Sequence, residues 1–196
     1  MTADEVATFE RCIAVGGVAL FPADTVYGLA TEPETREGVD RLYRIKRRPA
    51  DRPAAVMFFE LSLALEALPD LGERTRAAVE RLLPGALTLV LPNPERRWPL
   101  ACGPEPEQLG LRVPALAGPR RPVLQSSANP SGGADARRLG DVDPAVRAGV
   151  DLELDGGELP GTPSTVVDLT RYESEGDFEV LREGAVPLAE VAGALA

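Results

Sequence analysis

Five cationic side chains gather within nine positions, from residue 44 to residue 52. Like charges this close repel one another, and the whole chain has a formal net charge of -10, so the cluster predicts an anionic ligand such as a phosphate. Lys46 is the only lysine, and its compact ammonium differs chemically from the planar guanidinium at every other cationic position. The alternative interpretation is a helix C-terminus whose positive charges favour the helix dipole. The cluster comprises Arg44, Lys46, Arg47, Arg48 and Arg52.

The loop SSANPSGG, residues 126–133, contains a second group of candidate anion ligands. Its hydroxyls, the amide of Asn129 and a turn that glycine permits would let several backbone N–H groups converge on an anion. The same composition is also found in ordinary turns. The chain has neither a GxxxxGK[ST] motif nor a GxGxxG motif after a strand, so P-loop and Rossmann modes of binding are excluded.

Arg112 is a third candidate, because it lies inside the apolar strand pattern LGLRVP. A charge in such a strand needs an ionic partner or a ligand to offset its desolvation, and an internal salt bridge explains it equally well. Thr25 and Ser164 carry hydroxyls at junctions of strand and loop, where such residues also serve as caps or turns.

The composition excludes several classes of protein. The chain has no histidine, which rules out Ser-His-Asp and Cys-His mechanisms and removes the commonest zinc ligand. Its net charge disfavours bulk binding of nucleic acid. Cys12 and Cys102 lie far apart without a CxxC spacing, so both are interpreted as structural and no metal site is predicted. The absence of an apolar span and of a signal peptide predicts a cytoplasmic protein.

Hydrophobic periodicity places these candidates on alternating strands and helices, which predicts an α/β fold on a twisted, mixed sheet. We interpret residues 1–196 as one domain, residues 22–28 as a turn-rich loop and residues 92–106 as a surface excursion. Strands are expected at residues 17–21, 54–59, 87–91, 109–113, 123–126, 152–154, 165–169 and 178–181. Helices are expected from about residue 34 to just before Pro49, at 61–68, 73–83 and 141–147, and from residue 187 onward.

Seven segments in order resemble the YrdC-like family of threonylcarbamoyl-AMP synthases. They are FPADTVYGLA, IKRRPADRPAAVMF, LLPGALTLVL, LGLRVP, SSANPSG, GTPSTVVDL and VLREGAV, and they span about residues 15–186. The resemblance implies a twisted open α/β sheet with a large, positively charged concave face. It also implies the short form of the family, which has the YrdC domain alone.

Family members condense L-threonine, bicarbonate and ATP into threonylcarbamoyl-AMP and pyrophosphate, which serve the t6A modification of tRNA. The resemblance therefore implies a nucleotidyltransferase, with Mg²⁺ accompanying ATP and with hand-over of the product to the tRNA threonylcarbamoyl-transfer complex. Chemistry would rest on positioning and charge neutralisation, with Lys46 and Arg48 as the catalytic residues.

The family motifs also imply the remaining ligands. KxR and SxN place four residues at the nucleotide phosphates: Lys46, Arg48, Ser127 and Asn129. Two further positions match nucleotide contacts, Arg52 and Arg182. The threonine subsite would comprise Thr25, Met57, Arg112 and Ser164.

Four residues depart from the family pattern and leave the amino-acid specificity open. Arg52 stands where the family commonly has asparagine, and Met57 stands where many members have histidine, although Met57 is equally explained as a core residue. Ala23 and Gln125 replace threonine and proline. Two alternatives therefore remain: a YciO-like paralogue with a different small substrate, and an RNA-binding or ribosome-maturation module that uses the same basic face.

Overall fold

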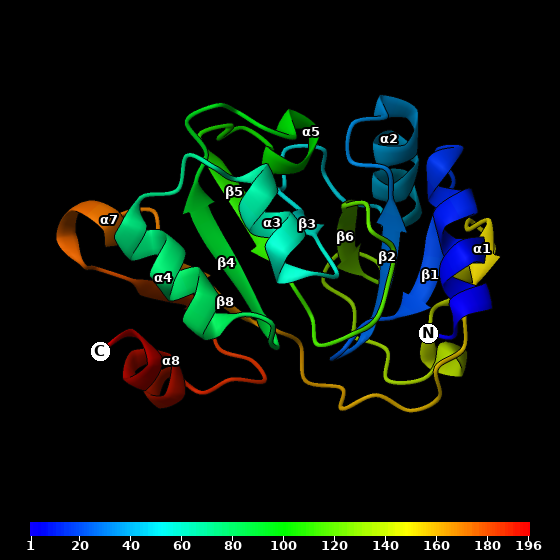
Figure 1. Cartoon of the computed structure of the whole chain (residues 1–196). Helices are drawn as coiled ribbons and strands as arrows, with labels where there is room; N and C mark the ends of the chain where they lie inside the picture. Colours follow the sequence, from blue (N-terminus) through cyan, green and yellow to red (C-terminus); the bar gives the residue numbers. More distant parts are fainter.

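Nine strands form one twisted, mixed sheet in the computed structural model, which describes residues 1–196 (Figure 1). Their order across the sheet is β7, β1, β2, β6, β3, β5, β4, β8, β9. Three pairs are parallel, namely β1 with β7, β3 with β5 and β4 with β8, and the others are antiparallel. The predicted mixed pairing is confirmed. The strands are β1 (Ala19–Pro22), β2 (Tyr27–Thr31), β3 (Ala55–Met57), β4 (Leu87–Pro92), β5 (Gln108–Arg112), β6 (Val123–Ser127), β7 (Leu152–Glu153), β8 (Thr165–Asp168) and β9 (Glu179–Arg182).

Most helices lie toward the two ends of this sheet, whereas α3 and α5 lie near its middle. In Figure 1, α1 and α2 lie beside β1 and β2, whereas α4, α7 and α8 lie at the end formed by β4, β8 and β9. No helix has both the length and the apolar character that crossing a membrane requires. The helices are α1 (Ala3–Ala14), α2 (Arg36–Ile45), α3 (Leu61–Ala67), α4 (Glu73–Leu82), α5 (Pro99–Cys102), α6 (Pro144–Arg147), α7 (Tyr172–Glu175) and α8 (Leu188–Leu195), with a 3-10 turn at Leu139–Asp141.

Side chains alternate between the two faces of the sheet, and the faces differ in what covers them. The larger core cluster lies on one face and includes Leu20 of β1, Leu89 of β4 and Leu42 of α2. On the other face a smaller cluster packs under α1, where the rings of Phe9 and Phe21 stack edge to face with their centroids 5.1 Å apart. Beyond that cluster, residues on the second face of β3, β5, β4 and β8 line a pocket. The uncovered half of this face therefore forms the candidate site.

Three parts of the fold differ from the sequence prediction. Residues 27–31 form the interior strand β2, because both neighbours β1 and β6 satisfy its backbone, although the turn residues before it suggested a loop. Helix α1 was not predicted, yet Thr2 and Glu5 form a capping box at its start. The segment 92–106 contains α5, whose Ala101 and Cys102 are buried, so it is more than a surface excursion. The one-domain interpretation of residues 1–196 stays a prediction.

Candidate active site

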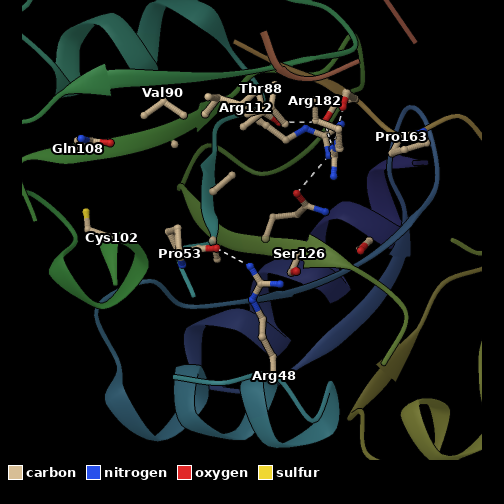
Figure 2. A pocket seen from close by; sticks show the side chains of 18 of the residues that line it. Arg48, Pro53, Thr88, Val90, Cys102, Gln108, Arg112, Ser126, Pro163 and Arg182 are labelled. Carbon is tan, nitrogen blue, oxygen red and sulfur yellow. Dashed lines mark hydrogen bonds between the residues drawn. The ribbon is translucent and has the colours of Figure 1, made fainter. Parts of the chain in front are cut away.

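The pocket has a volume of about 470 Å³ and collects residues from widely separated segments. Its floor is the second face of the sheet, where Gly110 and Val90 leave room above β5 and β4. In Figure 2, Arg48 enters from one side of this space, while Arg112 and Arg182 lie together on the opposite side. Three guanidinium groups thus face one cavity in a protein whose overall charge is negative.

Arg48 is presented to the pocket by the turn that follows α2. The helix ends at Ile45, and Arg47 adopts the left-handed conformation with φ of 49°, so the chain reverses between Lys46 and Arg48. The Arg48 guanidinium donates from Nη2 to the Pro53 carbonyl at 2.7 Å, and its buried Nε has no partner. A guanidinium held by one bond with donors to spare suits a phosphate or carboxylate ligand.

Arg112 marks the other end of the pocket and is held by an internal ion pair. Its Nη2 lies 2.5 Å from Oδ1 of Asp24, and Nη1 donates to Oε1 of Gln125 at 3.2 Å. Arg112 is buried and Asp24 is partly buried, so the salt bridge anticipated as the alternative is present, and Arg112 also lines the pocket. Burial lowers the pKa of Arg112, the Asp24 carboxylate raises it, and the nearby Arg182 lowers it. Its guanidinium nevertheless stays charged.

Hydroxyl groups surround the Arg112 end of the pocket. Arg182 of β9 donates to the Ser164 carbonyl at 2.7 Å, and the hydroxyls of Ser164 and Thr88 lie 2.9 Å apart. Thr25 Oγ1 lies 3.5 Å from Arg112 Nη2. Three residues predicted to bind the substrate threonine, namely Thr25, Arg112 and Ser164, therefore lie together at this end. Arg182, which is predicted to bind the nucleotide, lies with them.

The SSANPSGG loop contributes side chains to the pocket, and most of its backbone donors are used elsewhere. Ser126 and Ser127 line the cavity. The N–H groups of Ala128, Ser131 and Gly133 each donate at 2.8 Å to carbonyls of the protein. Those three groups do not converge on an anion site, so the predicted backbone cradle is not formed by them.

Six of the ten predicted site residues line the pocket, and the other four do not. Lys46 and Asn129 are buried beside it, with exposed fractions of 1% and 8%. Met57 is fully buried in the α1 cluster, next to Phe9 and Phe59, which is the core position anticipated as its alternative. Arg52 is exposed, and its side chain makes no hydrogen bond. The six that line the pocket are Thr25, Arg48, Arg112, Ser127, Ser164 and Arg182.

The pocket also contains residues that sequence reasoning did not assign to it. Asp135 and Glu105 are its carboxylates, and Gln125 and Cys102 complete two of its walls. The sequence gives one reason to expect Gln125 in the site, because this residue departs from the family pattern. No feature of the sequence indicates Asp135. Burial raises the pKa of the Cys102 thiol, which keeps it neutral and favours a structural role.

An α/β sheet with arginines from three separate segments around one concave pocket is an arrangement suited to a small anionic ligand. The sequence model of the Sua5/YciO/YrdC family, described as "Telomere recombination", matches residues 11–184. The chain belongs to this family.

Individual relatives agree with this assignment. The chain is 32% identical over 190 residues to the threonylcarbamoyl-AMP synthase of Pyrococcus abyssi, a match that covers 91% of this chain and 54% of that protein. The structure of P. abyssi Sua5 complexed with L-threonine superposes with a TM-score of 0.81 at 28% identity, over 99% of this chain and 58% of that one. E. coli YciO shares the fold, with a TM-score of 0.79 at 24% identity over 97% and 94% of the two chains. The chain spans only 54% and 58% of the length of the Pyrococcus abyssi and Bacillus subtilis relatives.

Proposed function

We propose that this chain is an L-threonylcarbamoyladenylate synthase, a nucleotidyltransferase that makes threonylcarbamoyl-AMP and pyrophosphate from L-threonine, bicarbonate and ATP. The observation that carries the proposal is the meeting of Arg48, Arg112 and Arg182 in one pocket, with hydroxyls between them. ATP and an amino-acid carboxylate are the anions that such a site would hold together. Delivery of the product for t6A modification of tRNA, through the tRNA threonylcarbamoyl-transfer complex, and a cytoplasmic location belong to the same proposal.

The reaction needs two steps that positioned charges can promote. The amine of threonine attacks the carbon of bicarbonate, and loss of water leaves a carbamate. A carbamate oxygen then attacks the α-phosphorus of ATP, and the bond to pyrophosphate breaks. Arg112 would hold the threonine carboxylate near Thr25 and Ser164, while Arg48 would neutralise charge that develops on the phosphates.

Mg²⁺ is expected to accompany ATP in this proposal. The structure has no cluster of three or more histidine, cysteine, aspartate or glutamate side chains able to hold a metal ion. Mg²⁺ is often bound through substrate phosphates, water and one or two carboxylates, and Asp135 and Glu105 are the pocket carboxylates that could approach it. The residues therefore fit an ion that arrives with the nucleotide.

The direct test is pyrophosphate release by the purified chain. We expect release that requires ATP, bicarbonate and L-threonine together, and much less with serine or without an amino acid. The product is identified as threonylcarbamoyl-AMP by mass spectrometry. Absence of pyrophosphate with all three substrates present would contradict the proposal.

Gln125 is expected to influence the choice of amino acid. Arg112 can only donate, so it fixes Gln125 Oε1 toward itself, and Nε2 is left without a hydrogen-bond partner in the protein. Gly28 makes room for this amide, because a Cβ there would lie 2.8 Å from Nε2. We expect Nε2 to donate to the bound amino acid.

Substitution of Gln125 by glutamate places a carboxylate beside the proposed site of the threonine carboxylate. The two like charges repel, so we expect KM for threonine to rise on the order of tenfold or more, while KM for ATP changes little. Steady-state kinetics with each substrate varied in turn measures both constants, and the ATP constant is the internal control. Equal changes in both constants would show that Gln125 does not act on the amino acid.

A second candidate is a YciO-like enzyme with another small substrate. Gln125 at the Arg112 end favours it, since this residue alters the part of the pocket proposed to hold the amino acid. Met57, which is buried in the core, leaves the pocket without the histidine that many family members have. ATP binding without threonine-dependent release of pyrophosphate would support this candidate. The RNA-binding alternative would instead give RNA affinity that falls steeply with salt and ignores ATP.

A further inference from the structure

The ammonium of Lys46 is enclosed by the protein and has no hydrogen left for a ligand. Nζ donates to the carbonyl of Asn129 at 2.8 Å, to Oδ1 of the same residue at 3.1 Å, and to the carbonyl of Ser127. An ammonium has three N–H donors, so each of them has an acceptor. Only 1% of Lys46 is exposed, and the residue does not line the pocket.

The residues that enclose Lys46 are connected to the pocket. Because Lys46 only donates, Asn129 must turn Oδ1 toward it, and Nδ2 then donates to the Gly133 carbonyl at 2.6 Å and lies 3.3 Å from Oδ1 of Asp135. Ser127 Oγ donates to the same Asn129 Oδ1 at 2.6 Å. Both Ser127 and Asp135 line the pocket. Lys46 thus orients two pocket side chains through Asn129.

We propose that Lys46 is a positioning residue, which acts through Asn129 on Ser127 and Asp135 and does not contact the substrate. The proposal rests on the proposed function, since it assumes that this pocket binds ATP. It reassigns the lysine of the KxR motif, which sequence reasoning interpreted as a phosphate ligand. Arg48 of the same motif keeps its place in the pocket.

The need for three converging donors explains why this position is a lysine in a chain that otherwise uses arginine. A planar guanidinium directs its donors outward in a fixed fork and is too large for a buried site shaped around an ammonium. Burial lowers the pKa of Lys46 from 10.5 to about 8; Arg48 lowers it too, and Asp135 raises it. The group therefore remains mainly protonated at neutral pH.

The single lysine permits a direct test, because protein labelled with ¹⁵N- and ¹³C-lysine gives one side-chain signal. In the free protein we expect an ammonium signal protected from exchange with water, with a titration midpoint near pH 8. Saturation with ATP should leave this signal almost unmoved, while the arginine side-chain signals of a second sample, labelled with ¹⁵N-arginine, shift. A Lys46 signal that exchanges freely with water or moves strongly with ATP would overturn the positioning role. ATP that perturbs no signal at all would overturn the proposed function and the positioning role with it.

Two substitutions provide an independent readout. A direct phosphate ligand should tolerate Lys46→Arg, because arginine also binds phosphate, whereas a positioning role predicts that Lys46→Arg and Lys46→Met lose at least tenfold in kcat/KM to a similar extent. Thermal unfolding identifies any variant that fails to fold. In that case the lysine spectra of the wild-type protein, with and without ATP, test the positioning role by themselves. Near-normal activity of Lys46→Arg would contradict the proposal.

Discussion

Replacing Arg48 by alanine is expected to slow pyrophosphate release by about a hundredfold to a thousandfold at saturating ATP. The guanidinium reaches the pocket from the turn after α2, and its only hydrogen bond is to the Pro53 carbonyl, so its remaining donors are free for a ligand. Loss of one positioned donor at developing negative charge typically has an effect of this size. Steady-state measurement of kcat and KM for ATP checks the prediction.

Arg44→Ala is the matched control, because it removes the same charge from the same basic cluster. Arg44 is exposed on α2, and its side chain makes only a 3.4 Å hydrogen bond to the Asp40 carbonyl. We expect this variant to keep its turnover. Arg48→Lys should recover little, since an ammonium lacks the fork that bonds Pro53 and a ligand together. Similar losses for Arg44→Ala and Arg48→Ala would indicate a general charge effect and contradict the role of Arg48.

Replacing Asp24 by alanine is expected to lower the free energy of unfolding by about 3 kcal/mol, because Arg112 is left buried without its ionic partner. The paired side chains are 5% and 13% exposed, so water replaces the lost carboxylate poorly. We also expect lower affinity for the amino acid, since Asp24 orients Arg112 at the proposed carboxylate site. Chemical denaturation followed by circular dichroism measures the loss of stability.

Two comparisons make the Asp24 prediction specific. Glu107→Ala removes a carboxylate from an exposed pair with Arg96, so it should leave the unfolding midpoint unchanged. The double variant Asp24→Ala/Arg112→Leu should be more stable than Asp24→Ala alone, because the unpaired charge is gone. A double variant that is less stable than Asp24→Ala would show that the unpaired guanidinium is not the cause.

Much of the fold and part of the site follow from local sequence pattern. Apolar runs located eight of the nine strands to within two or three residues, and turn residues located the loops that carry Arg48 and Asn129. The missed strand β2 shows the limit of such patterns. Its residues are buried on both faces between β1 and β6, so no alternation of apolar and polar residues marks it.

Motif spacing did not tell which side chains face the pocket. Lys46 and Arg48 belong to one motif, yet the left-handed backbone of Arg47 between them turns the two side chains in different directions. The lysine donates to buried carbonyl oxygens, and the arginine lines the cavity. Met57 lies on the pocket face of the sheet, but α1 covers that part of the face. Whether a helix from elsewhere in the chain lies over a strand is a tertiary property.

The sequence alone therefore located the basic cluster at residues 44–52 and predicted an anion as its ligand, and it determined the α/β architecture that carries the cluster. The tertiary structure decided which residue of the cluster faces the pocket and which is buried beside it, because partners distant in the chain fix each side chain. Asn129 lies 83 positions from Lys46 and Asp24 lies 88 positions from Arg112, and only packing of the sheet brings them within hydrogen-bond distance. Local periodicity predicts the helix or strand to which a residue belongs, whereas long-range contacts determine which groups its side chain contacts.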